Sequence, residues 1–154
     1  MYRLLSFLLI GLIFAGCGPE VVYERSTAFA PEGWSYADSV RFEYNIVDTT
    51  RAYELVLDVH HSADFPYQNF YVLLHTGLPS GKRVSEQLSL QLAGDFGAWL
   101  GDCSGNDCTL SIPLLGNARF GDPGTYTLTV EQHSRDEPLQ GVNGLGLRVV
   151  VRER

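Results

Sequence analysis

The chain has 154 residues, of which 11 are lysine or arginine and 18 are aspartate or glutamate, so its formal net charge is −7 at pH 7. An acidic surplus of this size argues against a nucleic acid partner and against broad attraction to anionic lipid. The length is enough for one domain with its own hydrophobic core and too short for two ordinary domains.

The first sixteen residues have the features of an export signal. Arg3 is the one charged side chain among them, and an uncharged, mostly apolar run extends from residue 4 to residue 16. This run has the length of a signal-peptide core and falls short of the roughly 20 residues that a membrane-spanning helix needs. We therefore predict a signal peptide over residues 1–16, rather than an uncleaved anchor helix or a buried core helix.

The end of this run, Phe14-Ala15-Gly16-Cys17, resembles the bacterial lipobox. The resemblance implies cleavage before Cys17 and acylation of Cys17 at the new N-terminus. A mature lipoprotein of this type carries two or three acyl chains, and two or more chains give stable attachment to a bilayer. Loss of Arg3 leaves 10 of the 11 basic residues against 18 acidic ones, a net charge of −8, so lipid and not electrostatics is expected to hold the protein.

Residues 17–36 are expected to be the acylated N-terminus followed by a tether or irregular segment. From residue 37 to residue 154, apolar and polar residues alternate with the period of two that half-buried β-strands show. Residues 69–78 are apolar on both faces and predict a central strand. The predicted strands are residues 39–47, 52–61, 69–78, 84–92, 109–115, 125–132 and 145–152.

Turn residues such as Pro79-Ser80-Gly81 and Asp122-Pro123-Gly124 separate these runs, and the glycines are expected in turns. Pro113 places its strand at a sheet edge or at a bulge. The sequence has no sustained helical periodicity. We therefore predict an all-β fold for residues 37–154, a single antiparallel β-sandwich of about 7–8 strands that is immunoglobulin-like or jelly-roll-like.

Two cysteines remain besides Cys17, and both lie in the loop GDCSGNDC. In an exported protein, an even pair across a short polar loop favours a local disulfide between Cys103 and Cys108. Two free thiols are the alternative. A metal site ranks third, because two sulfurs are half of a zinc site and no histidine is near in sequence.

Four segments carry a resemblance to a known family. They are DFPYQNFYVLLHTGLPSGK, GAWLG, GTYTLTVEQ and EQHSRDEPLQGVNGLGLRV, and with the lipobox they cover nearly the whole chain. In this order they resemble the gliding-motility lipoprotein GldH family of the Bacteroidota. Two features depart from the family pattern, namely Phe65, where tyrosine is usual, and the loop that contains the cysteine pair.

The resemblance implies a component needed for gliding over surfaces, linked to type IX secretion and not known as an enzyme. Its implied partners are other gliding or type IX secretion envelope proteins, and the lipid bilayer through acylated Cys17. The implied location is the cell envelope, with a domain that we expect to face the periplasm. The choice between inner and outer membrane stays open, because the residues after Cys17 contain one acid, Glu20, and no acidic export tag.

A search for catalytic chemistry agrees with this absence of enzyme activity. The sequence has no G-x-S-x-G elbow, no phosphate-binding glycine loop and no dinucleotide fingerprint. His60 and His61 are neighbours on a strand and should point to opposite faces, while His75 and His133 each stand alone. We therefore predict no catalytic residue, no metal site and no cofactor.

The remaining candidates for an interaction site are family-motif residues. Exposed aromatic side chains could anchor a partner protein or stack on sugar rings, although most are expected to cover the open ends of the core. Arg135 is either a clamp that ties its loop to the sandwich through a nearby acid or part of a docking surface, and we favour the clamp. The candidate residues are Tyr67, Asn69, Tyr71, Trp99, Arg135, Asp136 and Arg148. Protein docking is the favoured function, and a glycan-binding lipoprotein is the alternative.

Overall fold

A computed structural model describes residues 18–152, so the predicted signal peptide and Cys17 lie outside the described residues. This part of the chain contains nine β-strands and one short 3-10 turn, η1 (Asp95–Gly97). The strands are β1 (Val21–Ala28), β2 (Val40–Ile46), β3 (Ala52–Ser62), β4 (Asn69–Gly77), β5 (Arg83–Gln91), β6 (Asp102–Ser104), β7 (Asp107–Ala118), β8 (Gly124–Gln132) and β9 (Val142–Arg152).

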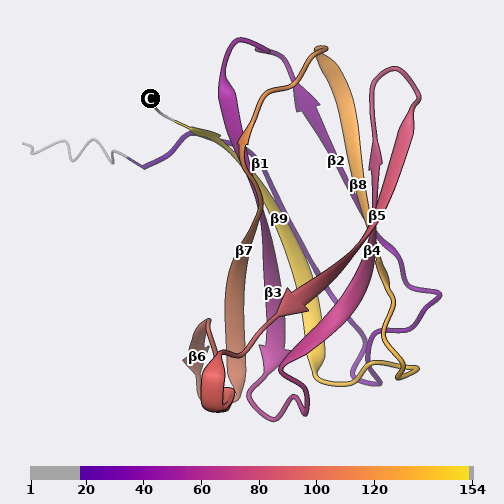
Figure 1. The fold of residues 1–154 in the computed structure, drawn as a ribbon, viewed down its shortest axis with the longest axis vertical. Coiled ribbons are helices and arrows are strands. Elements are labelled where there is room, and N and C mark those ends of the chain that lie inside the picture. Colours follow the sequence, from indigo (N-terminus) through magenta and orange to yellow (C-terminus); the bar gives the residue numbers. More distant parts are fainter. Residues whose placement is uncertain (1–17, 153–154) are drawn as a thin grey trace, which may run out of the picture.

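The strands form two layers that face each other (Figure 1). The five-stranded sheet has the order β1-β9-β3-β7-β6, and the four-stranded sheet has the order β2-β8-β4-β5. All neighbouring strands are antiparallel. The predicted all-β sandwich is confirmed, and β4 lies inside its sheet, between β8 and β5, as its apolar sequence indicates.

The core lies between the two sheets and follows the predicted alternation. Every second residue of β2 is buried, from Val40 to Ile46, and β8 repeats the pattern at Tyr126, Leu128 and Val130. Loop residues also belong to this core, since Trp34 and Leu139 have almost no exposed surface and pair backbone to backbone. The sandwich is therefore closed at one end by chain that lies outside its strands.

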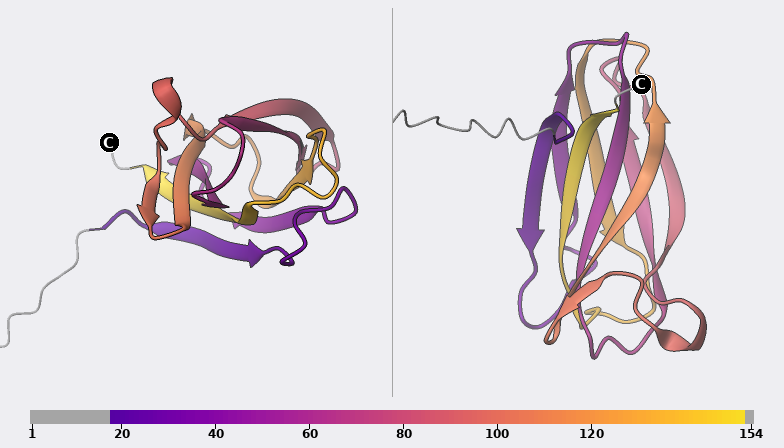
Figure 2. Two further views of the ribbon diagram at one scale, coloured as in Figure 1. Left: turned by 90° about the horizontal axis from the view of Figure 1, so that it is seen from below. Right: turned by 90° about the vertical axis from the view of Figure 1, so that its left-hand side faces the viewer.

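Strand β1 corrects the expectation of a tether or irregular segment over residues 17–36. Residues 21–28 pair with β9 along the edge of the five-stranded sheet (Figure 2). The sequence pattern missed β1 because none of its side chains is fully buried, so the pairing depends on backbone hydrogen bonds. Gly144 permits the close approach, since a Cβ atom there would lie 2.6 Å from the carbonyl oxygen of Thr27. This glycine serves a strand and not a turn, contrary to expectation.

The described chain starts and finishes at the same end of the sandwich, which we call the proximal end. There the amide of Val151 donates to the carbonyl of Glu20, and Arg51 forms an ion pair with the Glu20 carboxylate at 2.6 Å. The opposite, distal end carries the Trp34 and Leu139 pairing. Strand β9 joins the two ends, and its eleven residues span about 35 Å at roughly 3.3 Å per residue.

The predicted inward residues of β5 and β7 are less buried than the alternation suggests. Val84, on β5, is 48% exposed. Ile112 and Leu114, on β7, are half-buried. Pro113 lies at an irregularity in the pairing of β7 with β3, as its sequence position predicts. The two sheets are therefore less tightly closed along β5 and β7 than along their centres.

No helix within residues 18–152 has the length and apolar character needed to cross a membrane.

Removal of a central side chain tests the core. Leu57, on β3, has no exposed surface, and we expect Leu57→Ala to lower the free energy of unfolding by about 2–5 kcal/mol through lost burial and a residual cavity. Urea denaturation followed by circular dichroism measures this change. Val47→Ala is the control, because Val47 is 78% exposed and its truncation should change stability by less than about 0.5 kcal/mol. Equal losses in both variants would contradict the sandwich core.

Candidate functional site

Five of the seven candidate residues line one groove at the distal end. The groove has a volume of about 640 Å³ and lies on the outer face of β4 and β5, against the loop after β8. Its walls combine aromatic, amide, charged and hydroxyl side chains. They are Tyr67, Asn69, Phe70, Tyr71, Gln87, His133, Ser134, Arg135 and Asp136.

Hydrogen bonds join the two walls of this groove. The Tyr67 hydroxyl donates to the Asp136 carboxylate at 2.6 Å, across 69 positions of sequence. The amide of His133 donates to the carbonyl of Tyr71 at 2.9 Å, and Asn69 donates to the hydroxyl of Ser89 at 2.7 Å. The Asp136 carboxylate, which stabilises the protonated hydroxyl, raises the pKa of Tyr67 above its ordinary value. These bonds therefore hold Tyr67, Asn69 and Asp136 in defined positions.

The loop after β8 is clamped by residues other than the predicted Arg135. The Glu137 carboxylate accepts hydrogen bonds from the Ser35 hydroxyl at 2.8 Å and from the Tyr36 amide at 2.9 Å. The Gln132 side chain bonds the Asp136 carbonyl from inside the loop. Arg135 is exposed, and within residues 18–152 it forms no ion pair. Within residues 18–152 the structure therefore shows no clamp by Arg135, which lines the groove instead.

The aromatic residues divide between the core and the surface. Trp34, Phe65 and Phe70 are at most 4% exposed, and Phe29 stacks on Trp34 with ring centroids 4.6 Å apart. These side chains close the distal end, as expected for most of the aromatics. Tyr67 and Tyr71 are instead 45% and 44% exposed, and both line the groove.

Trp99 lies outside the groove. Its ring packs against His61 with centroids 4.7 Å apart, and its backbone pairs with Ala93. His61 is fully buried on β3 opposite Cys108, and Cys108 is joined to Cys103 by a disulfide with an Sγ–Sγ distance of 1.97 Å. This arrangement gives Trp99 a packing contact beside the β6 and β7 hairpin.

Arg148 also lies away from the groove, on the outer face of the five-stranded sheet. Its guanidinium donates to both carboxylate oxygens of Asp58, at 2.6 Å and 2.8 Å, and to the Ser111 hydroxyl at 3.0 Å. The Arg148 side chain is 33% exposed. Partial burial acts to raise the pKa of Asp58, but the bonds from Arg148 and Ser111 outweigh it and lower the pKa below its usual value.

The histidines have different neighbours in the part of the chain that the structure describes. His75, expected to stand alone, contacts the Ser85 hydroxyl through Nδ1 at 2.6 Å and lies 3.3 Å from the Glu131 carboxylate through Nε2. His60 contacts the hydroxyls of Ser26 at 3.4 Å and Thr109 at 3.0 Å, whereas a hydrolytic triad would place a carboxylate on the second ring nitrogen. His61 points into the core, on the face opposite to His60, as predicted from their adjacency. Residues 18–152 contain no group of three or more potential metal ligands.

Comparison with known proteins places the chain in a family. The family model described as GldH lipoprotein matches residues 21–149, which include strands β1 to β8, most of β9 and both walls of the groove. The chain belongs to the GldH lipoprotein family. Its relatives carry lipoprotein and gliding-motility names. The matched residues 21–149 include β1, so the match starts before the predicted domain boundary at residue 37.

Two relatives align with nearly the whole chain. The gliding motility lipoprotein GldH homolog of Christiangramia forsetii is 23% identical over 155 residues, which cover 96% of this chain and 94% of that protein. The gliding motility lipoprotein GldH of Flavobacterium johnsoniae is 21% identical over 149 residues, which cover 92% of each. The family resemblance seen in the sequence motifs is confirmed.

The Asp58 and Arg148 pair predicts a response to acid. Because the pKa of Asp58 is lowered, its stabilising contribution is complete above the unfolded value of about 3.9 and is lost as pH falls through the lower folded value. Asp58→Asn should cost about 1 kcal/mol at pH 7 and flatten the decline in stability between about pH 5 and pH 2. Thermal unfolding across this pH range measures both effects, and Glu32→Gln, at an exposed position, is the control.

The Tyr67 and Asp136 bond makes a second titration prediction. Asp136→Asn removes the negative charge that holds the proton on Tyr67, so the pKa of Tyr67 should fall towards its ordinary value. Carbon-13 NMR of ring-labelled tyrosine follows the ionisation directly. Glu131→Gln changes a neighbouring acid that does not line the groove and should leave the Tyr67 titration unchanged. The same Tyr67 titration in Asp136→Asn and in the unaltered protein would contradict the bond.

Proposed function

We propose that this GldH-family lipoprotein is a non-catalytic docking subunit of the gliding machinery, linked to type IX secretion. Acylated Cys17 holds it at a membrane of the cell envelope, and the domain faces the periplasm. The distal groove receives a partner protein of the same machinery. Family membership supports the process, and the groove supports the docking role.

One observation carries the docking role. Tyr67, Asn69 and Tyr71 converge with Arg135 and Asp136 from segments more than 60 positions apart. Tyrosine and arginine are enriched among the residues that dominate protein interfaces, because they bury large areas and still form hydrogen bonds. The Arg135 guanidinium can meet a carboxylate of a partner, since no acid of the described chain pairs with it.

The position of the groove fits a membrane-anchored subunit. Gly18, the first described residue, directly follows Cys17 and precedes the proximal contact between Glu20 and Val151. The groove lies at the other end of β9, about 35 Å away. An anchor at Cys17 therefore leaves the groove accessible to a partner beyond the lipid headgroups.

Groove and anchor variants test this function in cells. We expect Tyr71→Ala combined with Arg135→Ala to reduce crosslinked recovery of gliding or secretion proteins at least tenfold, equivalent to about 1.4 kcal/mol, and to abolish surface spreading. Cys17→Ser should lose the same recovery because the subunit leaves the membrane. Val47→Ala, which changes an exposed apolar residue outside the groove, is the matched control.

The assay is a pull-down from mildly crosslinked envelopes, with each variant expressed at the level of the unaltered protein. Normal spreading and normal recovery in the groove variant would exclude the groove as the docking surface. Normal spreading after deletion of the gene, with neighbouring components still expressed, would exclude the gliding role itself.

A second candidate function is glycan binding. Tyr67 and Tyr71 are half-exposed in a concave groove beside the amides of Asn69 and Gln87, an arrangement that suits a sugar ring stacked on an aromatic face. Affinity electrophoresis in gels that contain envelope polysaccharide separates the two functions. A glycan-binding protein is retarded and loses the retardation in Tyr71→Ala, whereas a docking subunit migrates as it does in plain gel.

A further inference from the structure

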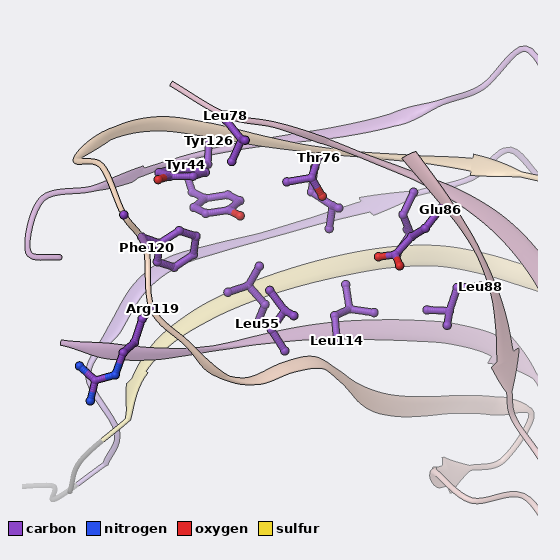
Figure 3. Close-up of a pocket in the computed structure, with 14 residues that line it drawn as sticks. Tyr44, Leu55, Thr76, Leu78, Glu86, Leu88, Leu114, Arg119, Phe120 and Tyr126 are labelled. Atoms are coloured by element: carbon purple, nitrogen blue, oxygen red, sulfur yellow. The ribbon is translucent and has the colours of Figure 1, made fainter. Parts of the chain in front are cut away.

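A second hollow lies between the two sheets, on the side of the sandwich formed by β5 and β7. This inter-sheet cleft has a volume of about 340 Å³ and is lined mainly by aliphatic and aromatic side chains. Its lining includes the buried core residues Leu55 and Leu128 and the half-buried Leu88 and Leu114. Figure 3 shows Leu55, Leu88 and Leu114 in this lining. None of its lining residues belongs to the distal groove.

The cleft exists because one side of the sandwich lacks a closing contact. On the opposite side, Tyr23 of β1 packs against Tyr44 of β2 with ring centroids 5.9 Å apart. On the cleft side, β5 is the last strand of its sheet, and β6 pairs with β7 only as far as Thr109. Within residues 18–152, no strand covers the outer edge of β5 or that of β7 beyond Thr109.

Strand β5 is well formed for pairing with another strand. It has nine residues, and its sequence RVSEQLSLQ has no proline or glycine to interrupt the backbone hydrogen bonds. An unpaired edge of this length is a template for an added strand. Gln87 on its outer face lines the distal groove, whereas Glu86 and Leu88 on its inner face line the cleft.

The charge of Glu86 indicates which type of side chain an added strand would place in the cleft. Glu86 pairs across the sheet with the buried Leu74, so its carboxylate is on the face that points towards the other sheet. Figure 3 shows the Glu86 side chain projecting into the cleft, whereas Arg119 points away from it. Within residues 18–152, Glu86 forms no ion pair or side-chain hydrogen bond. A lysine or arginine flanked by aliphatic side chains complements this surface.

The same carboxylate argues against two other occupants. A second copy of β5 would bring Val84, Glu86 and Leu88 to the cleft, and Arg83 would point to the opposite face. Two acidic side chains would then lie in the same cleft with no basic side chain between them. A lipid acyl chain would fill the aliphatic part but would place hydrocarbon against an unpaired carboxylate.

We propose that the edge of β5 and the inter-sheet cleft together bind an extended segment of a partner protein. The segment pairs with β5 as an additional strand. Its alternate aliphatic side chains enter the cleft between Leu88 and Leu114, and one lysine or arginine among them meets Glu86. This site is separate from the distal groove, so its test does not depend on the gliding role of the protein.

Defined peptides test the site. The probes are a panel of fluorescent nine-residue peptides that alternate threonine with leucine, isoleucine or valine and carry either lysine or glutamate at one central aliphatic position. They are titrated by fluorescence anisotropy against the full-length lipoprotein in phosphatidylcholine nanodiscs. We expect peptides of the lysine series to bind at least tenfold more tightly than their glutamate counterparts, and hydrogen exchange to slow at the amides of β5.

Charge reversal gives the decisive comparison. Glu86→Lys should invert the preference, so that the glutamate peptides bind more tightly. Glu43→Lys is the matched control, because Glu43 is an exposed acid on β2, the other edge strand of the same sheet, and should leave the preference unchanged. Leu114→Gln should weaken both series while the far-ultraviolet circular dichroism spectrum stays the same.

Three outcomes would overturn the proposal. They are the absence of binding by every peptide, equal affinity of the two series in the unaltered protein, and slowed exchange at strands other than β5. Displacement of bound peptides by a fluorescent fatty acid, with tighter binding of the fatty acid than of any peptide, would assign the cleft to an alkyl chain instead.

Discussion

The structure depends on the pairing of β9 with two neighbours at once. Strand β9 pairs with β1 on one side and with β3 on the other, and its inward residues Leu145, Leu147 and Val149 are completely buried. It also connects the proximal end, where the described chain starts, to the distal end, where the groove lies. The backbone hydrogen bonds of β9 therefore fix the position of β1. They also fix the end of the loop that connects β8 to β9.

Much of the sandwich could be predicted because burial leaves a period of two in the sequence. Val40, Phe42 and Tyr44 alternate with polar residues, and the structure buries all three. Strand β1 could not be predicted in this way, because an edge strand that is held by its backbone leaves little pattern in its side chains. Gly144 was the available signal, since a glycine inside a strand often marks a close backbone approach.

The sequence indicated which residues line the groove but not that the fold brings them together. The family motifs contain Tyr67, Tyr71 and Arg135, but their convergence depends on the pairing of β4 with β8 and on the path of the following loop. The clamp expected of Arg135 is supplied by Glu137, two positions later. The Glu137 carboxylate accepts the hydrogen bonds from Ser35 and Tyr36. The cleft had no sequence signal, because the alternation of β5 and β7 is the same whether or not another strand covers their edges.

The course of β1 has a mechanical consequence. The strand begins at the proximal end and runs towards the distal end alongside β9, so a pull between the proposed lipid anchor and the proposed partner in the groove would be directed along the strand axis. Hydrogen bonds between antiparallel strands lie perpendicular to that axis. Such a pull would load the whole β1 and β9 ladder in shear, with its bonds sharing the force, instead of unzipping them one after another from the proximal end.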